Sequence, residues 1–412
     1  MQSPWSLPDL TITHQRGLQV LYCFIPYRFL SVPTLFAPVV LVASCVRFAA
    51  SAVPVDAKLA AMKSVHLVIA ALFLPKEFAS GVYADLHLPA LEKMLAWGAS
   101  TGALASNPSA SSGRTEVSGL SLESHLCELF GVPCRAGAQI APISAAFDGL
   151  CNATGECWLR ADPVHLRLQR DQLVLLPEVK IGADEAAQMC VSLNQHFTGQ
   201  GTEFFAPHPQ RWYMRLAKLP DIETVPLSQV VGRNVHGLLP KGVEALHWHQ
   251  LFNEIQMLLF AHPVNEAREA RGELSVNSVW LWGGGATNEP LQKTYESVSS
   301  DDVLAGMLAA AADISFAGWS GRWSSKESNG EQLLVWNGLR QALQRGDMTA
   351  WRGALQDFET GYAQPLWQAL RSGKIERLRI DALGEDGIRR ALLTRADAWA
   401  FWRRAKPLDK YF

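Results

Sequence analysis

The sequence predicts an α/β protein, with a largely parallel sheet flanked by helices and a smaller inserted α+β subdomain. Residues 65–74, VHLVIAALFL, form an unbroken apolar run ending at Pro75, as in a strand buried on both faces of a parallel sheet. A hairpin, a helix and two further strands are predicted within residues 156–240. Helical periodicity dominates the remainder. These patterns place the α/β domain at 62–155 and 241–412 and the inserted subdomain at 156–240.

Composition narrows the function classes. The chain has 412 residues, of which 48% are hydrophobic, so it can bury one large core or two medium ones. Its net charge of −2 gives no sign of the basic excess typical of nucleic-acid binding. The seven cysteines include no CxxC pair and no zinc-type spacing. We interpret them as reduced thiols, which favours the cytoplasm.

Residues 1–61 differ from the rest of the sequence. Residues 29–46 are apolar and uncharged, which is long enough for a marginal membrane span. Three interpretations compete: a signal peptide, a membrane anchor, and an over-long gene start ahead of Met62. We favour the last, because the first predicted strand follows Met62 almost at once. A membrane partner is expected only if the segment is an anchor.

The first domain segment continues with helices. Pro89 begins a predicted helix that ends at Gly98. Residues 99–118 are small and polar and predict a long loop. Two short helices are then expected, at 120–130 and 143–147.

The predicted subdomain begins with strands at 157–167 and 172–176, which a polar turn joins into a hairpin. A helix at 183–197 follows. Two more strands are expected at 203–205 and 211–216.

The stretch 248–285 carries the most information. Apolar residues of 248–259 recur at helical spacing until Pro263 ends the pattern, and the polar run 265–273 is typical of a solvated helix. Residues 278–282 predict a strand of the parallel sheet, apolar on both faces. Gly283, Gly284 and Gly285 follow it, so their amides are expected to approach an anion at the carboxyl end of that strand.

The carboxyl third is predicted to be mostly helical. Helices are expected at 302–312, 330–345 and 349–371, a half-exposed strand at 374–380, and a final helix at 386–404 that caps the fold.

Several runs together resemble archaeal-type cofactor-independent phosphoglycerate mutases of the alkaline phosphatase superfamily. The resemblance covers about residues 66–290, and from Met62 onward the chain also resembles a bacterial group labelled predicted phosphoglycerate mutases or Rpf-type regulatory proteins. The sharpest run is HPVNEAREARGELSVNSVWLWGGG at 262–285. The other runs are DLHLPALEKMLAWG at 85–98, CELFGV at 127–132, WLRADPVHL at 158–166 and FFAPHPQRWYMRL at 204–216.

The resemblance implies an alkaline-phosphatase-like sheet and a phosphoglycerate-sized ligand. In active relatives it also implies two divalent metals and a nucleophilic serine. This chain departs from that chemistry. Ala70, Ala71 and Leu72 stand where the family places a metal aspartate and a glycine, and Leu122 stands at the nucleophile position. No histidine follows His262, although the family's later metal ligands include histidines.

No metal site and no cofactor are therefore predicted, and Mn²⁺ or Mg²⁺ is expected only if an altered site is active. The histidines at 165, 208, 247 and 249 are interpreted as loop or surface groups. The catalytic residue is unassigned, with Ser121, Glu123 and Ser124 as weak candidates. The predicted ligand-binding residues are Arg160, Asp162, Arg211, Asn265, Arg268, Asn277, Gly283, Gly284 and Gly285. Arginine suits such a ligand because its planar fork binds oxyanions bidentately. The alternative is ordinary ion pairing, of Arg160 with Asp162 and of Arg268 with Glu266 or Glu269.

Three functions follow. The favoured one is a degenerate, regulatory mutase-like protein that binds a small phosphorylated or carboxylated metabolite. The second is an active phosphoglycerate mutase or phosphotransferase with an altered site, metal-free or using Asp85, Glu123 and Asp148. The third is a scaffold without a ligand that uses the tryptophan-rich carboxyl third to bind a protein partner. No nucleic acid is expected as a partner.

Overall fold

The computed structural model describes residues 63–74, 81–83, 85–100, 121–133, 139–150, 155–176, 179–286, 291–324, 330–384, 387–400 and 402–411. The alternatives for residues 1–61 therefore lie outside the described residues, as does nearly all of the predicted loop at 99–118. Within the described ranges, no helix combines the length and hydropathy that a membrane crossing requires.

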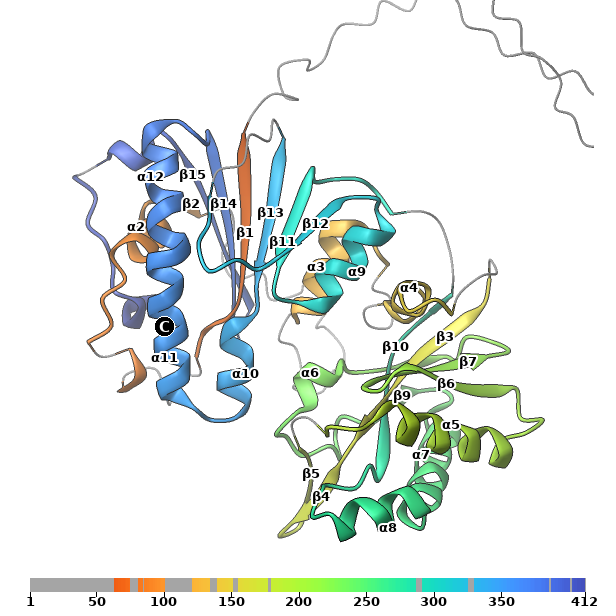
Figure 1. The fold of residues 1–412 in the computed structure, drawn as a ribbon. Coiled ribbons are helices and arrows are strands. Elements are labelled where there is room, and N and C mark those ends of the chain that lie inside the picture. The colour runs from red at the N-terminus through yellow and green to blue at the C-terminus, as the bar shows by residue number, and fades with distance from the viewer. Residues whose placement is uncertain are drawn as a thin grey trace, which may run out of the picture. The chain divides into compact units, whose positions relative to one another are not determined.

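The larger sheet has seven strands, and five of them are parallel (Figure 1). In spatial order they are β12 (Ser315–Gly318), β11 (Ser297–Ser300), β13 (Glu331–Trp336), β1 (Ser64–Phe73) and β14 (Arg377–Gly384), followed by the antiparallel β15 (Gly387–Thr394) and β2 (Ala99–Ser100). Along β1, Leu67 and Ile69 enter one core while Val68 and Ala70 enter the other. This two-sided burial explains the unbroken apolar run, and the predicted α/β class is confirmed.

Helices cover both faces of this sheet (Figure 1). One core contains residues of α2 (Pro89–Trp97), α11 (Met348–Phe358) and α12 (Gln364–Ser372), the last two joined by a π-helical turn at Glu359–Ala363. The other contains residues of α3 (Leu122–Phe130) and α9 (Val303–Ala311).

The smaller sheet is antiparallel and has four strands, β10 (Ser278–Ala286), β3 (Cys157–Val164), β7 (Arg211–Leu216) and β6 (Thr202–His208). Its core also contains residues of α5 (Ala183–His196), α7 (Ala245–Phe260) and α8 (Pro263–Ala270). Of the predicted hairpin between 157–167 and 172–176, the structure forms a shorter one, β4 (Leu166–Gln169) with β5 (Gln172–Leu175), whereas residues 157–164 are β3 and pair with β10 and β7. The elements around this sheet thus reach Ala286, beyond the predicted limit of 240.

The shorter elements are α4 (Ala141–Phe147), α6 (Leu227–Val230), β8 (Ile222–Glu223), β9 (Lys241–Gly242) and α10 (Gly338–Gln344).

The assignment of residues 278–282 to the parallel sheet was wrong, because β10 pairs antiparallel with β3. The strand is apolar on both faces since Val279 and Leu281 face one core while Trp280 and Trp282 face another. The three glycines lie inside β10 rather than beyond its end. A Cβ on Gly284 would lie 2.7 Å from Leu159 Cδ2, so close packing of neighbouring strands explains this glycine.

Two predicted helices near the carboxyl end were also wrong. Residues 387–394 form β15 and not a helix, and a single turn of 3₁₀-helix, Asp397–Trp399, follows. Residues 330–345 divide into β13 and α10 on either side of Asn337. In both segments a short apolar run fits helix and strand equally well, and strand pairing decides between them: β15 pairs with the preceding β14, and β13 pairs with the distant β1.

Candidate functional site

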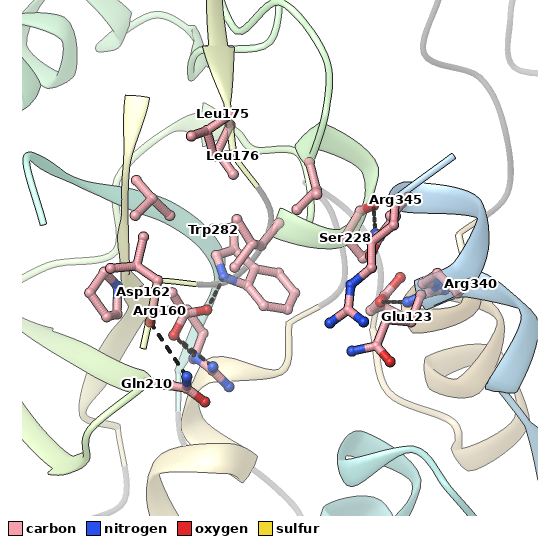
Figure 2. Close-up of a pocket in the computed structure, with 17 residues that line it drawn as sticks. Glu123, Arg160, Asp162, Leu175, Leu176, Gln210, Ser228, Trp282, Arg340 and Arg345 are labelled. Carbon is pink, nitrogen blue, oxygen red and sulfur yellow. Dashed lines mark hydrogen bonds and ion pairs between the residues drawn. The ribbon is translucent and has the colours of Figure 1, made fainter. Parts of the chain in front are cut away.

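A pocket of about 320 Å³ lies where the two sheets' elements meet (Figure 2). One wall comes from β3 and β10, and the other from α3, α6 and α10. Its polar lining includes Glu123, Arg160, Asp162, Ser228, Trp282 and Arg340. Concave sites that combine apolar walls with a few convergent polar groups are typical of small-ligand binding.

The β3 wall presents a buried ion pair. Asp162 Oδ1 accepts hydrogen bonds from Arg160 Nε at 3.1 Å and Nη2 at 2.7 Å, and its Oδ2 accepts one from Trp282 Nε1 at 2.7 Å. The guanidinium also lies 5.2 Å and 5.4 Å from the ring centroids of Tyr213 and Trp282. Only 7% of Arg160 and 1% of Asp162 is exposed. These contacts hold the arginine in one orientation beside the pocket.

The opposite wall presents a second pair, in which Arg340 Nη1 donates to Glu123 Oε1 at 2.7 Å (Figure 2). Burial alone would raise the pKa of Glu123, but the charge and hydrogen bond of Arg340 outweigh it and hold this pKa below its ordinary value. Glu123 is therefore an ionised partner of Arg340. An ionised carboxylate has no proton to donate, so Glu123 is unsuited to act as a general acid.

Further polar groups stand at the carboxyl ends of β11 and β13, the edge where open α/β sheets bind ligands. Asn337 donates from its backbone N–H to Asp301 Oδ1 at 2.7 Å and from Nδ2 to Asp302 Oδ2 at 2.8 Å. Asp302 also caps α9 through the N–H groups of Leu304 and Ala305. The loops that end these two strands are thus tied to one another.

Leu122, which the resemblance puts at the nucleophile position, has an apolar side chain. Leu122 begins α3 and is 1% exposed. Ser121 caps that helix: its Oγ accepts from Ser124 N–H and donates to Ser124 Oγ, both at 3.0 Å. The hydrogen bonds of Ser121 are therefore those of a helix cap.

Ala71 has an unusual backbone. Its φ of 55° lies in the left-handed region, where the β1–β14 ladder is irregular between Ile69 and Phe73. Such a φ favours glycine, and the resemblance places a glycine in residues 70–72. The end of β1 therefore has a backbone conformation that suits glycine, with alanine at that position.

Three polar residues of the stretch 262–285 form hydrogen bonds away from the pocket. Asn265 donates to Leu259 O and Val276 O and accepts from Val276 N–H, at 2.7 to 2.9 Å. Arg268 is 2% exposed and donates to Leu274 O, Lys180 O and Glu185. Asn277 Oδ1 and Nδ2 bond the backbone of Leu166 at 2.8 Å each. The carboxylate partners of Arg268 are Glu185, from α5, and Glu273, rather than the predicted Glu266 or Glu269.

Arg211 also has a carboxylate partner. Its Nε and Nη2 donate to the two oxygens of Asp148 at 3.0 and 2.8 Å, and Tyr213 OH donates to Asp148 Oδ2. Of the predicted site residues, the structure brings only Glu123, Arg160 and Asp162 to the pocket lining. Arg340 and Trp282 join them there. Arg340 was missed by the sequence analysis. A helical pattern shows which face is polar, but it does not show that Arg340 pairs with Glu123, 217 positions away.

One group of possible metal ligands was also missed. Among the described residues, His66, His125 and Asp381 have donor atoms that all lie within 4.8 Å of one another. They are buried, and they lie between β1, β14 and α3 rather than in the pocket lining. The sequence does not indicate this group, because its members lie in separate segments and Asp381 is 315 positions from His66.

We compared the sequence with protein-family models and with curated proteins. No protein-family model matches the sequence. The chain is 25% identical over 184 residues to a 2,3-bisphosphoglycerate-independent phosphoglycerate mutase of Methanosarcina barkeri, covering 42% of this chain and 46% of the relative. It is 26% identical over 192 residues to a probable mutase of the same kind from Geobacter sulfurreducens, covering 44% and 47%. The matches therefore span about half the length of these curated relatives.

Two solved structures are also similar. A cofactor-independent phosphoglycerate mutase from Thermoplasma acidophilum covers 81% of this chain and 90% of its own, at 15% identity and a TM-score of 0.39. A protein from Pyrococcus horikoshii covers 81% and 87%, at 12% identity and a TM-score of 0.47.

Proposed function

We propose that this protein, whose sequence is similar to cofactor-independent phosphoglycerate mutases, binds a small phosphorylated or carboxylated acid without converting it. It would act as a regulatory member of that group. One observation carries the proposal: the pocket holds an arginine clamped in place, while Leu122, beside the pocket residue Glu123 in the chain, stands where the resemblance puts the nucleophile.

Arg160 is suited to bind an oxyanion. Among the described residues, its hydrogen bonds go to Asp162 through Nε and Nη2, which leaves the Nη1 hydrogens for a ligand. The two aromatic rings and the carboxylate fix the side chain before a ligand arrives, which lowers the entropic cost of binding. A pocket of about 320 Å³ suits a small acid.

The absence of a hydroxyl at position 122 supports the non-catalytic part of the proposal. Glu123, its neighbour, is engaged by Arg340. A guanidinium there supplies a fixed positive charge beside the ligand without the open coordination positions that a catalytic metal needs.

The proposal is tested by calorimetric titration of 3-phosphoglycerate into the full chain. We expect Arg160→Lys to weaken binding at least about tenfold, because lysine keeps the charge but not the planar fork. Arg211→Lys is the matched control, since Arg211 also pairs with an aspartate but does not line the pocket. Equal affinities in both variants, or no binding by the wild type, would contradict the proposal.

Catalysis is assayed in parallel. We expect no mutase turnover of 3-phosphoglycerate with Mn²⁺ or Mg²⁺ present. Turnover that a chelator abolishes would instead favour the alternative of an active enzyme with an altered site.

A further inference from the structure

The buried group His66, Asp381 and His125 joins three elements of the larger domain. His66 lies on β1 and Asp381 on the neighbouring β14, where Asp381 pairs in register with Val68. His125 reaches them from α3. The two histidines are 0% exposed and Asp381 is 2% exposed. Three polar side chains at this depth need mutual compensation, because each loses its contacts with water.

A single carboxylate oxygen lies between the two imidazoles. Asp381 Oδ2 is 3.1 Å from His66 Nε2 and 2.9 Å from His125 Nε2. The other carboxylate oxygen, Oδ1, is buried and has no hydrogen-bond partner within the described part of the chain. Buried carboxylate oxygens are rarely left without a partner, so the site has spare ligand capacity.

The second ring nitrogen of each histidine faces a polar group, although only that of His66 lies at hydrogen-bond distance. His66 Nδ1 lies 2.8 Å from Tyr295 OH. His125 Nδ1 faces the Glu128 carboxylate at 3.5 Å, without completing a hydrogen bond. Metal-bound histidines characteristically direct their other ring nitrogen to a hydroxyl, carboxylate or carbonyl in this way.

These outer contacts constrain the inner ones. If the Nδ1 atoms carry the hydrogens, both Nε2 atoms point lone pairs at a carboxylate oxygen. Three acceptor atoms facing one another repel, so a cation must lie among them. Either additional protons or one metal ion can satisfy that requirement. Neighbouring ligand atoms around a tetrahedral ion with bonds of about 2.0–2.1 Å lie about 3.3 Å apart, close to the two separations seen here.

We propose that His66 Nε2, His125 Nε2 and the Asp381 carboxylate bind one divalent transition-metal ion. Two imidazoles and a carboxylate are typical ligands of Zn²⁺. The ion would tie β1, β14 and α3 together as a structural site. This site is separate from the pocket, and it does not depend on the proposed function.

One neighbouring charge opposes the ion. Arg390 Nε lies 3.9 Å from Asp381 Oδ2, and Arg390 Nη2 lies 3.5 Å from Glu128 Oε1. This guanidinium repels a cation at the site, although it is too far from Asp381 to hydrogen-bond. Replacing Arg390 by glutamine should therefore tighten metal binding, a change that a purely structural hydrogen-bond network does not predict.

The experiment refolds the full chain from denaturant with a chelator, with Zn²⁺ or with Co²⁺, because an enclosed site admits an ion only while the chain is open. One ion per chain and the visible absorption of tetrahedral Co²⁺ are expected. His125→Gln and Asp381→Asn should lose the ion. His249→Gln, which alters a histidine bonded to Pro240 O outside the cluster, should keep it. Tyr295→Phe should weaken affinity by about 10- to 100-fold.

Two results overturn the proposal. The first is a wild type that takes up no stoichiometric ion on refolding, which would mean that protons alone hold the cluster together. The second is uptake that Asp381→Asn leaves unchanged. If the core variants do not refold, X-ray absorption of the Zn²⁺-loaded wild type decides, because two imidazoles with oxygen are expected and a shell containing sulfur contradicts the assignment.

Discussion

At the scale of single residues, polar character in the sequence predicted polar neighbours but not their identity. Arg160 and Asp162 form the ion pair that the sequence analysis gave as the alternative to ligand binding, and both also line the pocket. Arg268 bonds two backbone carbonyls and a glutamate from α5 instead. The difference arises because an arginine in a polar helix is equally able to meet a ligand, a carbonyl or a carboxylate. Only the packing of distant segments decides which of these lies within reach.

Arg268→Ala should destabilise the protein by about 3–5 kcal/mol, because it removes a buried, paired cation and leaves the carbonyls of Leu274 and Lys180 without this donor. Arg271→Ala is the control, since Arg271 pairs with the same Glu185 but is 48% exposed, and a much smaller loss is expected. Urea unfolding measures both. Equal losses would show that burial of Arg268 contributes little.

Ala71→Gly should stabilise the protein by about 1 kcal/mol, because glycine adopts positive φ without the steric cost that alanine bears. Ala70→Gly, one residue earlier in the same strand, should destabilise it by about 0.5–1 kcal/mol through chain entropy. Thermal and urea unfolding give the sign of each change. Loss of stability in both variants would argue against backbone strain at Ala71.

At the scale of elements, local patterns located most helices and strands but not their partners. The helices α5 and α7 appear where periodicity placed them, whereas the first strand of the predicted hairpin lies largely in the antiparallel sheet as β3. The strand β10 was found, yet its sheet was not, because antiparallel pairing with β3 joins residues more than 100 positions apart. Residues 387–394 were assigned to a helix, but they form a hairpin with the preceding strand β14, and this pairing outweighs the local preference.

The pair that ties α4 to β7 should make stability depend on pH. Burial alone would raise the pKa of Asp148, but hydrogen bonds from Arg211 and Tyr213 outweigh it and lower this pKa below its ordinary value. A carboxyl with a lowered folded-state pKa stabilises the protein above its unfolded pKa, about 3.9, and that stabilisation is lost as the pH falls through the folded value.

Asp148→Asn should therefore be less stable than the wild type at pH 7, and the gap should narrow as the pH falls below about 4. Arg211→Gln removes the other partner of the same pair, so its gap should narrow in parallel. Urea unfolding between pH 7 and pH 3 provides the measurement. A gap that stays constant over this range would show that the pair does not couple protonation to folding.

At the scale of the whole molecule, the sequence predicted an α/β body with a second, smaller sheet. It did not predict the pocket. The residues that line it come from elements far apart in the sequence, as Glu123 and Arg340 show. No local sequence pattern indicates that these elements lie side by side in the fold. The favoured function consequently rests on Arg160 and Leu122 more than on the residues of 262–285.

The position of strands in the larger sheet predicts a gradient of protection. β1 lies between two parallel neighbours and is buried, whereas β12 is an exposed edge strand. Backbone amides of β1 should exchange with solvent only by global unfolding, while those of β12 exchange by local opening. Hydrogen exchange in low denaturant tests this. Comparable exchange rates in the two strands would contradict the expected order.

The central place of β1 also bears on how the chain is made. Its partner β13 begins 258 residues after β1 ends, so the most apolar strand of the sheet leaves the ribosome long before any neighbour exists. At about 5–20 residues per second, that interval is roughly 13–50 s. During this interval the apolar segment VHLVIAALFL has no partner strand to bury it. Exposed apolar segments of this kind aggregate and are bound by chaperones. We therefore expect aggregation to threaten this protein during synthesis more than after folding.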